Sequence, residues 1–146
     1  MHGKDNRLLN CTASIALGLA NKIQDSGYNF AAGNNNFITA TNAIALGMNN
    51  RVEGQSAIAL GQNNKVTGKG SYSMGDGNIV EYSGGAPGSN GAFGYKNQVT
   101  GAQAFAMGHT NKVHHHKAIA LGHNNIIPAS GKNTNYDDEY INTNGL

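Results

Sequence analysis

The sequence has little charge, few aromatic side chains and almost no cysteine. Charged residues make up 12% of its 146 residues, aromatic residues make up 7%, and tryptophan is absent. So small a charged fraction argues against a long solvated helix and against a charge-rich disordered tail. The single cysteine, Cys11, excludes an intramolecular disulfide framework.

Long apolar runs and a strong net charge are also missing. A formal net charge of +2 is too small to indicate binding to nucleic acid or to an anionic membrane. No segment approaches the ~18 consecutive apolar residues of a membrane-spanning helix. Met1 to Asp5 are not followed by the apolar stretch of a signal peptide. We therefore expect no nucleic-acid partner and no membrane contact by this part of the chain.

Asparagine and glycine are abundant where large side chains are scarce. The sequence holds 22 Asn and 21 Gly, together 43 of 146 residues. This leaves too few large apolar side chains for a conventional globular core, and such a composition on its own suggests disorder. Whether the chain is disordered depends on where these residues stand.

The asparagines and glycines follow an internal repeat. The phrase Ala-Ile-Ala-Leu-Gly occurs three times, starting at Ala43, Ala57 and Ala118. Each aligned glycine is followed by Asn three residues later and by Val or Ile five residues later, as in Gly47, Asn50 and Val52. The eight aligned glycines, at spacings of 15, 14, 14, 14, 19, 14 and 14 residues, are Gly18, Gly33, Gly47, Gly61, Gly75, Gly94, Gly108 and Gly122. A pattern kept in eight copies excludes disorder for roughly residues 12–130.

The length of the repeat indicates the architecture. Helical repeats need about 33 residues or more, whereas fourteen residues suffice for two short strands and two tight turns. The period does not match the hexapeptide helix of acyltransferases, and the turn residue is Asn rather than the Asp of calcium-binding nonapeptide rolls. The sequence therefore predicts an all-β fold, a two-sided β-solenoid.

Strand alternation predicts which side chains are inside. In the first strand of each coil it sends Ala and Gly inward and the residues between them outward; in the second it sends Val or Ile inward. Gly and Asn suit the turn because both tolerate positive φ, and stacked coils would form an Asn ladder with a spacing of about 4.8 Å. The turn residues singled out are Gly47, Asn50, Gly61, Asn64, Gly108 and Asn111.

The outward residues of the first strands form an apolar stripe across all eight coils. A face about 34 Å long that carries Ile, Leu, Phe and Met is not stable in water unaided. We expect it to be the shared core of an obligate homo-oligomer. The stripe includes Ile44, Leu46, Ile58, Leu60, Phe105, Met107, Ile119 and Leu121.

The repeats resemble the YadA-like head of trimeric autotransporter adhesins, in which Ser/Asn-x-Ala-x-Gly is followed by x-x-Asn-x-Val. The resemblance runs from Thr12 to Ala129. It implies a left-handed parallel β-roll, with three chains around a threefold axis, displayed on a bacterial cell surface and anchored in the outer membrane by segments absent from this chain. Residues 1–11 are then a cap or a remnant of expression, 12–130 the head, and 131–146 a C-terminal cap or the start of the neck.

Two features are candidates for binding a host receptor or an extracellular-matrix protein. The interval of 19 residues between Gly75 and Gly94 inserts a loop at 81–90, and insertions in solenoids often lie on the binding face. A row of cations stands four residues after the aligned glycines and either contacts an acidic partner or keeps the sheet soluble. Its members are Lys22, Arg51, Lys65 and Lys112. The candidate partner-binding residues are Glu81, Tyr82, Pro87, Tyr95, Arg51, Lys65 and Lys112.

The remaining motifs do not indicate catalysis, a cofactor or a metal. His109 and His123 occupy equivalent positions, and three histidines follow one another at 114–116, but no Cys or carboxylate lies near them in the repeat. The sequence lacks a phosphate-binding loop and a nucleophile elbow. The alternative is a repetitive surface for ice binding or bacterial self-association. Ice binding requires a regular Thr ladder, yet only Thr39, Thr67 and Thr100 share a position.

Overall fold

The computed structural model describes residues 2–82, 84 and 89–129, together with the backbone of 140–142. These residues form strands and turns and no helix, so this part of the chain has no helix long and apolar enough to cross a membrane. The predicted all-β class is confirmed.

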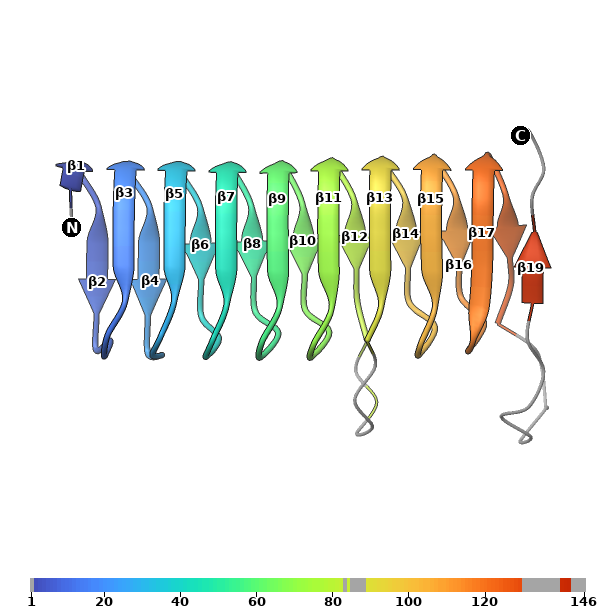
Figure 1. Cartoon of the computed structure of the whole chain (residues 1–146), viewed down its shortest axis with the longest axis horizontal. Helices are drawn as coiled ribbons and strands as arrows, with labels where there is room; N and C mark the ends of the chain where they lie inside the picture. Colours follow the sequence, from blue (N-terminus) through green and yellow to red (C-terminus); the bar gives the residue numbers. More distant parts are fainter. Residues whose placement is uncertain (1, 83, 85–88, 130–139, 143–146) are drawn as a thin grey trace.

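Each coil of the chain supplies one strand to each of two sheets (Figure 1). The strands of the first sheet are β1 (His2–Lys4), β3 (Ile15–Leu19), β5 (Phe30–Asn34), β7 (Ile44–Met48), β9 (Ile58–Gln62), β11 (Tyr72–Asp76), β13 (Gly91–Tyr95), β15 (Phe105–His109), β17 (Ala118–His123) and β19 (Tyr140–Asn142). Those of the second are β2 (Arg7–Leu9), β4 (Lys22–Gln24), β6 (Phe37–Ile38), β8 (Arg51–Val52), β10 (Lys65–Val66), β12 (Ile79–Val80), β14 (Gln98–Val99), β16 (Lys112–Val113) and β18 (Ile126–Ile127).

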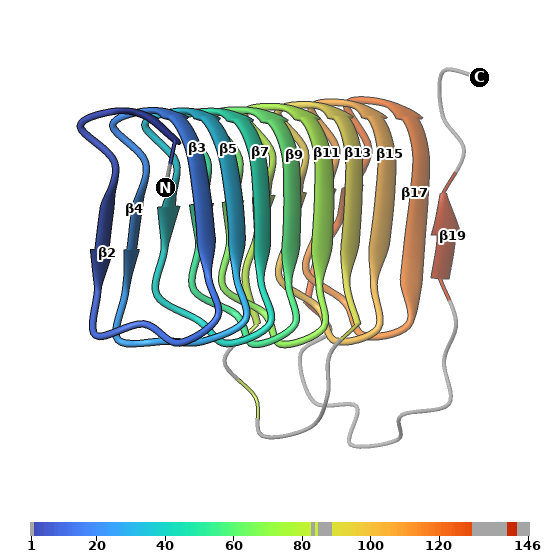
Figure 2. The ribbon, with the colours of Figure 1, turned by 60° about the vertical axis from the view of Figure 1, so that its left-hand side comes forward.

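Both sheets are parallel and keep the register of the repeat. The first sheet has ten strands and the second has nine, and each strand pairs with the one two places further along the chain. Ala45 pairs with Ala59, and Gly47 pairs with Gly61. Figure 2 shows the two sheets facing each other as the walls of a flattened tube. This arrangement confirms the predicted parallel β-solenoid.

The roll begins before residue 12. β1 and β2 lie within residues 1–11, which the sequence assigned to a cap, and they form one more coil. Gly3 pairs with Gly18, and Asn6 takes the place of the repeat asparagine, its Oδ1 accepting from Nδ2 of Asn21 at 3.0 Å. Leu8 stands where the other coils have Val or Ile. The described chain therefore has nine complete coils, from β1–β2 to β17–β18.

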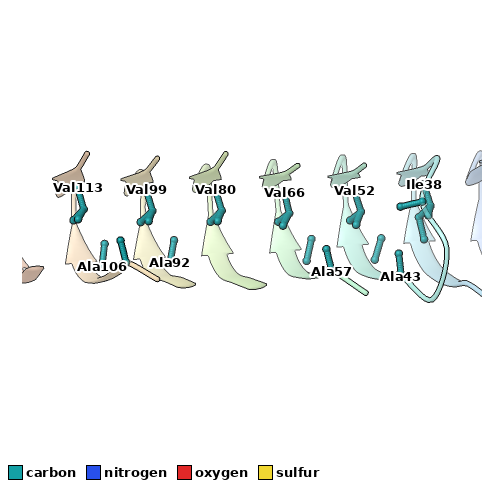
Figure 3. Packing of buried hydrophobic residues seen from close by; sticks show 14 of the residues in the cluster. Ile38, Ala43, Val52, Ala57, Val66, Val80, Ala92, Val99, Ala106 and Val113 are labelled. Atoms are coloured by element: carbon teal, nitrogen blue, oxygen red, sulfur yellow. The ribbon is translucent and has the colours of Figure 1, made fainter. Parts of the chain in front are cut away.

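The core is one column of branched side chains packed against a wall of alanines. The column consists of Ile23, Ile38, Val52, Val66, Val80, Val99, Val113 and Ile127, all of which have no exposed surface. Figure 3 shows its valines above alanines such as Ala43 and Ala57. Because alanine is short, the two sheets approach closely, and the interior has no room for a larger side chain.

The expectation that the aligned glycines line this interior was wrong. Gly47 is exposed and has a φ of +118°, which breaks the alternation of the strand. A Cβ at Gly47 would lie 2.0 Å from the carbonyl oxygen of Gly61. Glycine is therefore required by the close approach of neighbouring coils at the turn, and a second alanine, such as Ala43, completes the inner wall instead.

The repeat asparagines form a buried ladder. Nδ2 of Asn50 donates to Oδ1 of Asn36 at 3.0 Å and to the Gly61 carbonyl at 2.8 Å, and the backbone N–H of Asn50 donates to the same Oδ1 at 3.1 Å. Positive φ was expected for these asparagines, but it belongs to the residue before, such as Asn49 with 56°. The ladder residues therefore stabilise the turn through side-chain hydrogen bonds rather than through an unusual backbone.

Candidate ligand-binding surfaces

The outer face of the ten-stranded sheet is apolar. Two columns of large side chains follow it from β3 to β17, and many of them remain open to solvent: Ile15 is 52% exposed, Met74 45% and Met107 47%. The predicted interface residues all lie in these two columns: Ile44, Leu46, Ile58, Leu60, Phe105, Met107, Ile119 and Leu121. The described residues leave this face uncovered, which is unusual for a stable monomer.

Aromatic rings fill the gap that one glycine leaves in this face. Gly91 begins β13 where the other coils have a large side chain, and a Cβ there would lie 2.5 Å from the Tyr72 ring and 2.7 Å from the Phe105 ring. Phe93 lies with its ring centroid 5.7 Å from that of Tyr72 and 5.4 Å from that of Phe105. The apolar surface is therefore continuous past the coil that carries the insertion.

The outer face of the nine-stranded sheet carries charged side chains, four of which form two ion pairs. Arg51 forms an ion pair with Glu53, its Nε donating to the carboxylate at 2.7 Å. Nζ of Lys65 lies 2.5 Å from the Glu81 carboxylate. Lys112 is exposed and has no ion pair with any other described residue. The predicted row of cations consists of Lys22, Arg51, Lys65 and Lys112, and two of these four are therefore neutralised by neighbouring carboxylates.

The cations of this face also flank an aromatic ring that the sequence argument passed over. Phe37 lies between Lys22 and Arg51 in neighbouring coils, with Nζ of Lys22 at 5.2 Å and the Arg51 guanidinium at 5.4 Å from the ring centroid. A hollow of about 610 Å³ adjoins Phe37, Lys22 and Arg7. Lys22, Phe37 and Arg51 share one repeat position, so the repeat predicts that they are neighbours. The residue type at this position varies from coil to coil, and the aromatic ring was therefore not singled out.

Two predicted binding residues that follow β12 lie at a second hollow on the same face. Glu81 and Tyr82 line a hollow of about 440 Å³ together with Lys65, Thr67 and Thr100. Thr67, Glu81 and Thr100 lie on successive coils, since their backbone N–H groups donate to the carbonyls of Val80, Val99 and Val113 respectively. Pro87, the third residue predicted from the inserted loop, lies outside the described residues.

Tyr95 lies elsewhere, at the end of β13. Its ring stacks on His109 with centroids 4.8 Å apart, and His109 in turn lies 4.9 Å from His123. The side chain of Tyr95 raises the pKa of the exposed Lys96 ammonium through a hydrogen bond. Tyr95 is therefore not part of the surface formed by Glu81 and Tyr82.

The other histidines do not gather into a metal-binding group. Nδ1 of His114 lies 2.7 Å from the Thr100 hydroxyl, and Nδ1 of His116 accepts from the Ala102 backbone N–H at 2.9 Å. Among the residues that the structure describes, no cluster of three or more His, Cys, Asp or Glu side chains is suited to hold a metal ion.

Comparison with known proteins places the repeat in a family. Residues 53–78 match two copies of the YadA head domain repeat. A comparison with curated proteins found no match. The matched segment includes β9, β10 and β11, and the strands before and after β9 pair with it in the same register. This match and the parallel β-solenoid both fit a YadA-like head with β-roll repeats.

Proposed function

We propose that the chain is the head of a bacterial surface adhesin, a binding module without catalysis, that works as a homotrimer. The observation that carries the proposal is the apolar outer face of the ten-stranded sheet in a chain whose repeats match the YadA head. Each chain buries a narrow core of alanine, valine and isoleucine and has its larger apolar side chains on this outer face. Packing the face against two further copies removes it from water.

The rest of the surface then defines where a ligand binds. With the ten-stranded sheets at the threefold axis, the nine-stranded sheets face outward in all three chains. The ligand is a host cell-surface receptor or an extracellular-matrix protein, bound by this outer β surface and the inserted loop. Anchoring in the outer membrane is supplied by segments outside this chain.

Light scattering on the purified chain tests the oligomer. The expected result is the mass of three chains, and Met107→Lys is expected to abolish it because a charged ammonium would be buried in the shared core. Gln98→Lys places the same charge on the nine-stranded sheet and is expected to leave the trimer intact. A folded wild-type monomer contradicts the proposal.

Adhesion is tested with immobilised collagen, immobilised fibronectin and cultured host cells. The wild-type head is expected to bind at least one of these, and a variant that lacks residues 84–88 and carries Asn90→Ala is expected to lose that binding while remaining a folded trimer. Binding that the deletion does not change argues against the inserted loop. If the wild-type head binds none of the three surfaces, the result argues against this set of ligands.

A further inference from the structure

The insertion changes a position that neighbouring coils reserve for glycine. Tyr82 occupies the seventh position after its aligned glycine, where coils on either side have Gly54, Gly68 and Gly101. A Cβ at Gly54 would lie 2.2 Å from the Gly68 carbonyl oxygen, and one at Gly101 would lie 1.9 Å from that of His115. The turns at Gly54 and Gly101 therefore have no room for a side chain at this position, whereas the coils that carry Ala40 and His115 there do. The longer coil provides the room, and an aromatic side chain occupies it.

The Tyr82 ring is held on two sides. A Cβ at Gly84 would lie 2.0 Å from the Tyr82 hydroxyl oxygen, so the backbone of Gly84 lies against the phenol, and a larger residue there would require the ring to move. The Tyr82 and His116 rings are perpendicular, with centroids 6.2 Å apart and planes at 89°. Because Gly84 and His116 limit its rotation, the ring is pre-oriented as one wall of the hollow.

The other walls of the hollow supply hydrogen-bonding groups with no net charge. Thr67 and Thr100 provide hydroxyl groups on either side of Glu81 along the sheet, and Glu81 is neutralised by Lys65 at 2.5 Å. An aromatic face beside hydroxyl, carboxylate and ammonium groups suits a ligand with an apolar face and several hydroxyl groups. A volume of about 440 Å³ accommodates one or two sugar rings. The paired charges favour a neutral ligand over a strongly anionic or cationic one.

From this arrangement we infer that the hollow beside the insertion binds a neutral hexopyranose unit of a glycan. The inference rests on the proposed adhesive function and gives the chemistry of its ligand. The C–H face of the sugar lies on the Tyr82 ring, and its hydroxyl groups bond to Glu81, Lys65 and Thr67. The site lies on the nine-stranded sheet, so it stays open when the ten-stranded sheets pack together.

Saturation-transfer NMR on the intact chain tests the site, with the methyl glycosides of glucose, galactose, mannose and N-acetylglucosamine as probes. At least one glycoside is expected to receive saturation at its ring protons, and Tyr82→Ala is expected to weaken its binding about tenfold or more. Thr67→Val, which keeps the shape of the side chain, is expected to weaken it several-fold. If no glycoside is saturated, or if both variants bind like the wild type, the inference is overturned.

Matched controls separate the site from general effects on the fold. Tyr28→Ala removes a tyrosine that is 68% exposed, and Thr39→Val alters a threonine at the repeat position of Thr67; both are expected to leave glycoside binding unchanged. If Tyr82→Ala does not fold, Thr67→Val and its Thr39→Val control decide the result.

Host-cell adhesion distinguishes a failure of this site from a failure of the proposed function. Adhesion that the glycoside inhibits and Tyr82→Ala abolishes supports both. Adhesion that neither affects overturns the saccharide site and leaves the adhesin proposal standing. A head that binds glycosides but adheres to none of the tested cells supports the site and contradicts the adhesin proposal.

Discussion

Replacing a ladder asparagine in the middle of the roll is expected to cost far more stability than replacing its exposed neighbour. Asn64 lies in the central coils and is 1% exposed. Its Nδ2 donates to Oδ1 of Asn50 at 3.0 Å and to the Gly75 carbonyl at 2.9 Å. Its Oδ1 accepts from the backbone N–H of Asn78 at 3.1 Å and from the Ser73 hydroxyl at 3.0 Å. One amide group therefore connects three successive coils.

The size of the loss follows from the groups that Asn64→Ala leaves without partners. The backbone N–H of Asn78 and the Ser73 hydroxyl lose an acceptor, and the Gly75 carbonyl loses a donor. Each buried group left unsatisfied costs about 1–3 kcal/mol, and some of them will relax toward water at the turn. We therefore expect the free energy of unfolding to fall by about 3–5 kcal/mol per chain.

Urea unfolding followed by circular dichroism measures this loss, with all variants at one protomer concentration because oligomerisation contributes to stability. The control is Asn63→Gly, which removes the neighbouring exposed amide and keeps a residue that tolerates the φ of 53° at that position. It is expected to change stability by less than about 1 kcal/mol. Equal losses for the two variants would refute the role of the buried ladder.

Three further predictions concern other parts of the repeat. Gly61→Ala is expected to destabilise the roll strongly, because its Cβ would lie 2.1 Å from the Gly75 carbonyl oxygen and its φ is +112°; thermal unfolding would show this as a lowered midpoint, and an unchanged midpoint would contradict it. Val66→Ala removes two fully buried methyl groups and is expected to cost about 2–3 kcal/mol, measured by urea unfolding, where a negligible loss would contradict the packing argument. Hydrogen bonds from Asn10 and Gln24 lower the pKa of Asp25, so Asn10→Gly is expected to raise that pKa in an NMR titration, and an unaltered titration would show that the bond from Asn10 is unimportant.

The period of the sequence was enough to predict most of the fold, because every coil of the solenoid has the same backbone path and the same packing. A side chain at the position of Val52 has the same surroundings as one at Val66. Residues that recur at a fixed spacing therefore identify the core directly. Strand alternation correctly separated Ala45, which is buried, from Ile44 and Leu46, which are partly exposed. This is why the sequence predicted the strands, the two walls and the apolar face without any long-range contact being known.

Alternation failed where the backbone leaves the strand conformation. It placed Gly47 inside, but the positive φ of that residue turns the chain outward, and spacing alone does not report φ. The first coil escaped notice because Leu8 replaces the usual Val or Ile. Ion pairs such as Lys65–Glu81 depend on side chains from different coils. The sequence analysis assigned Glu81 to the inserted loop, although it follows Gly75 by six residues, as Thr67 follows Gly61.

The two coils that are longer than 14 residues each have an additional pair of polar contacts between neighbouring coils. In two of the regular coils the amide four residues before the aligned glycine donates to a turn carbonyl: Ala57 donates to Gly54 at 3.2 Å, and Ser71 donates to Gly68 at 3.3 Å. In the 19-residue coil the amide of Asn90 donates instead to the Ser71 hydroxyl at 3.2 Å, and Oδ1 of Asn90 accepts from the amide of Ala104 at 3.1 Å.

The same pair of residue types accompanies the 15-residue coil, where the amide of Asn29 donates to the Ser14 hydroxyl at 3.2 Å and Oδ1 of Asn29 accepts from the amide of Ala43 at 2.7 Å. In both long coils the asparagine amide therefore bonds to a serine hydroxyl of the preceding coil instead of to a carbonyl in its own turn. Shortening the insertion alone would leave Asn90 buried in a turn built for alanine. A deletion of 84–88 combined with Asn90→Ala is therefore the variant that isolates loss of the loop from damage to the roll.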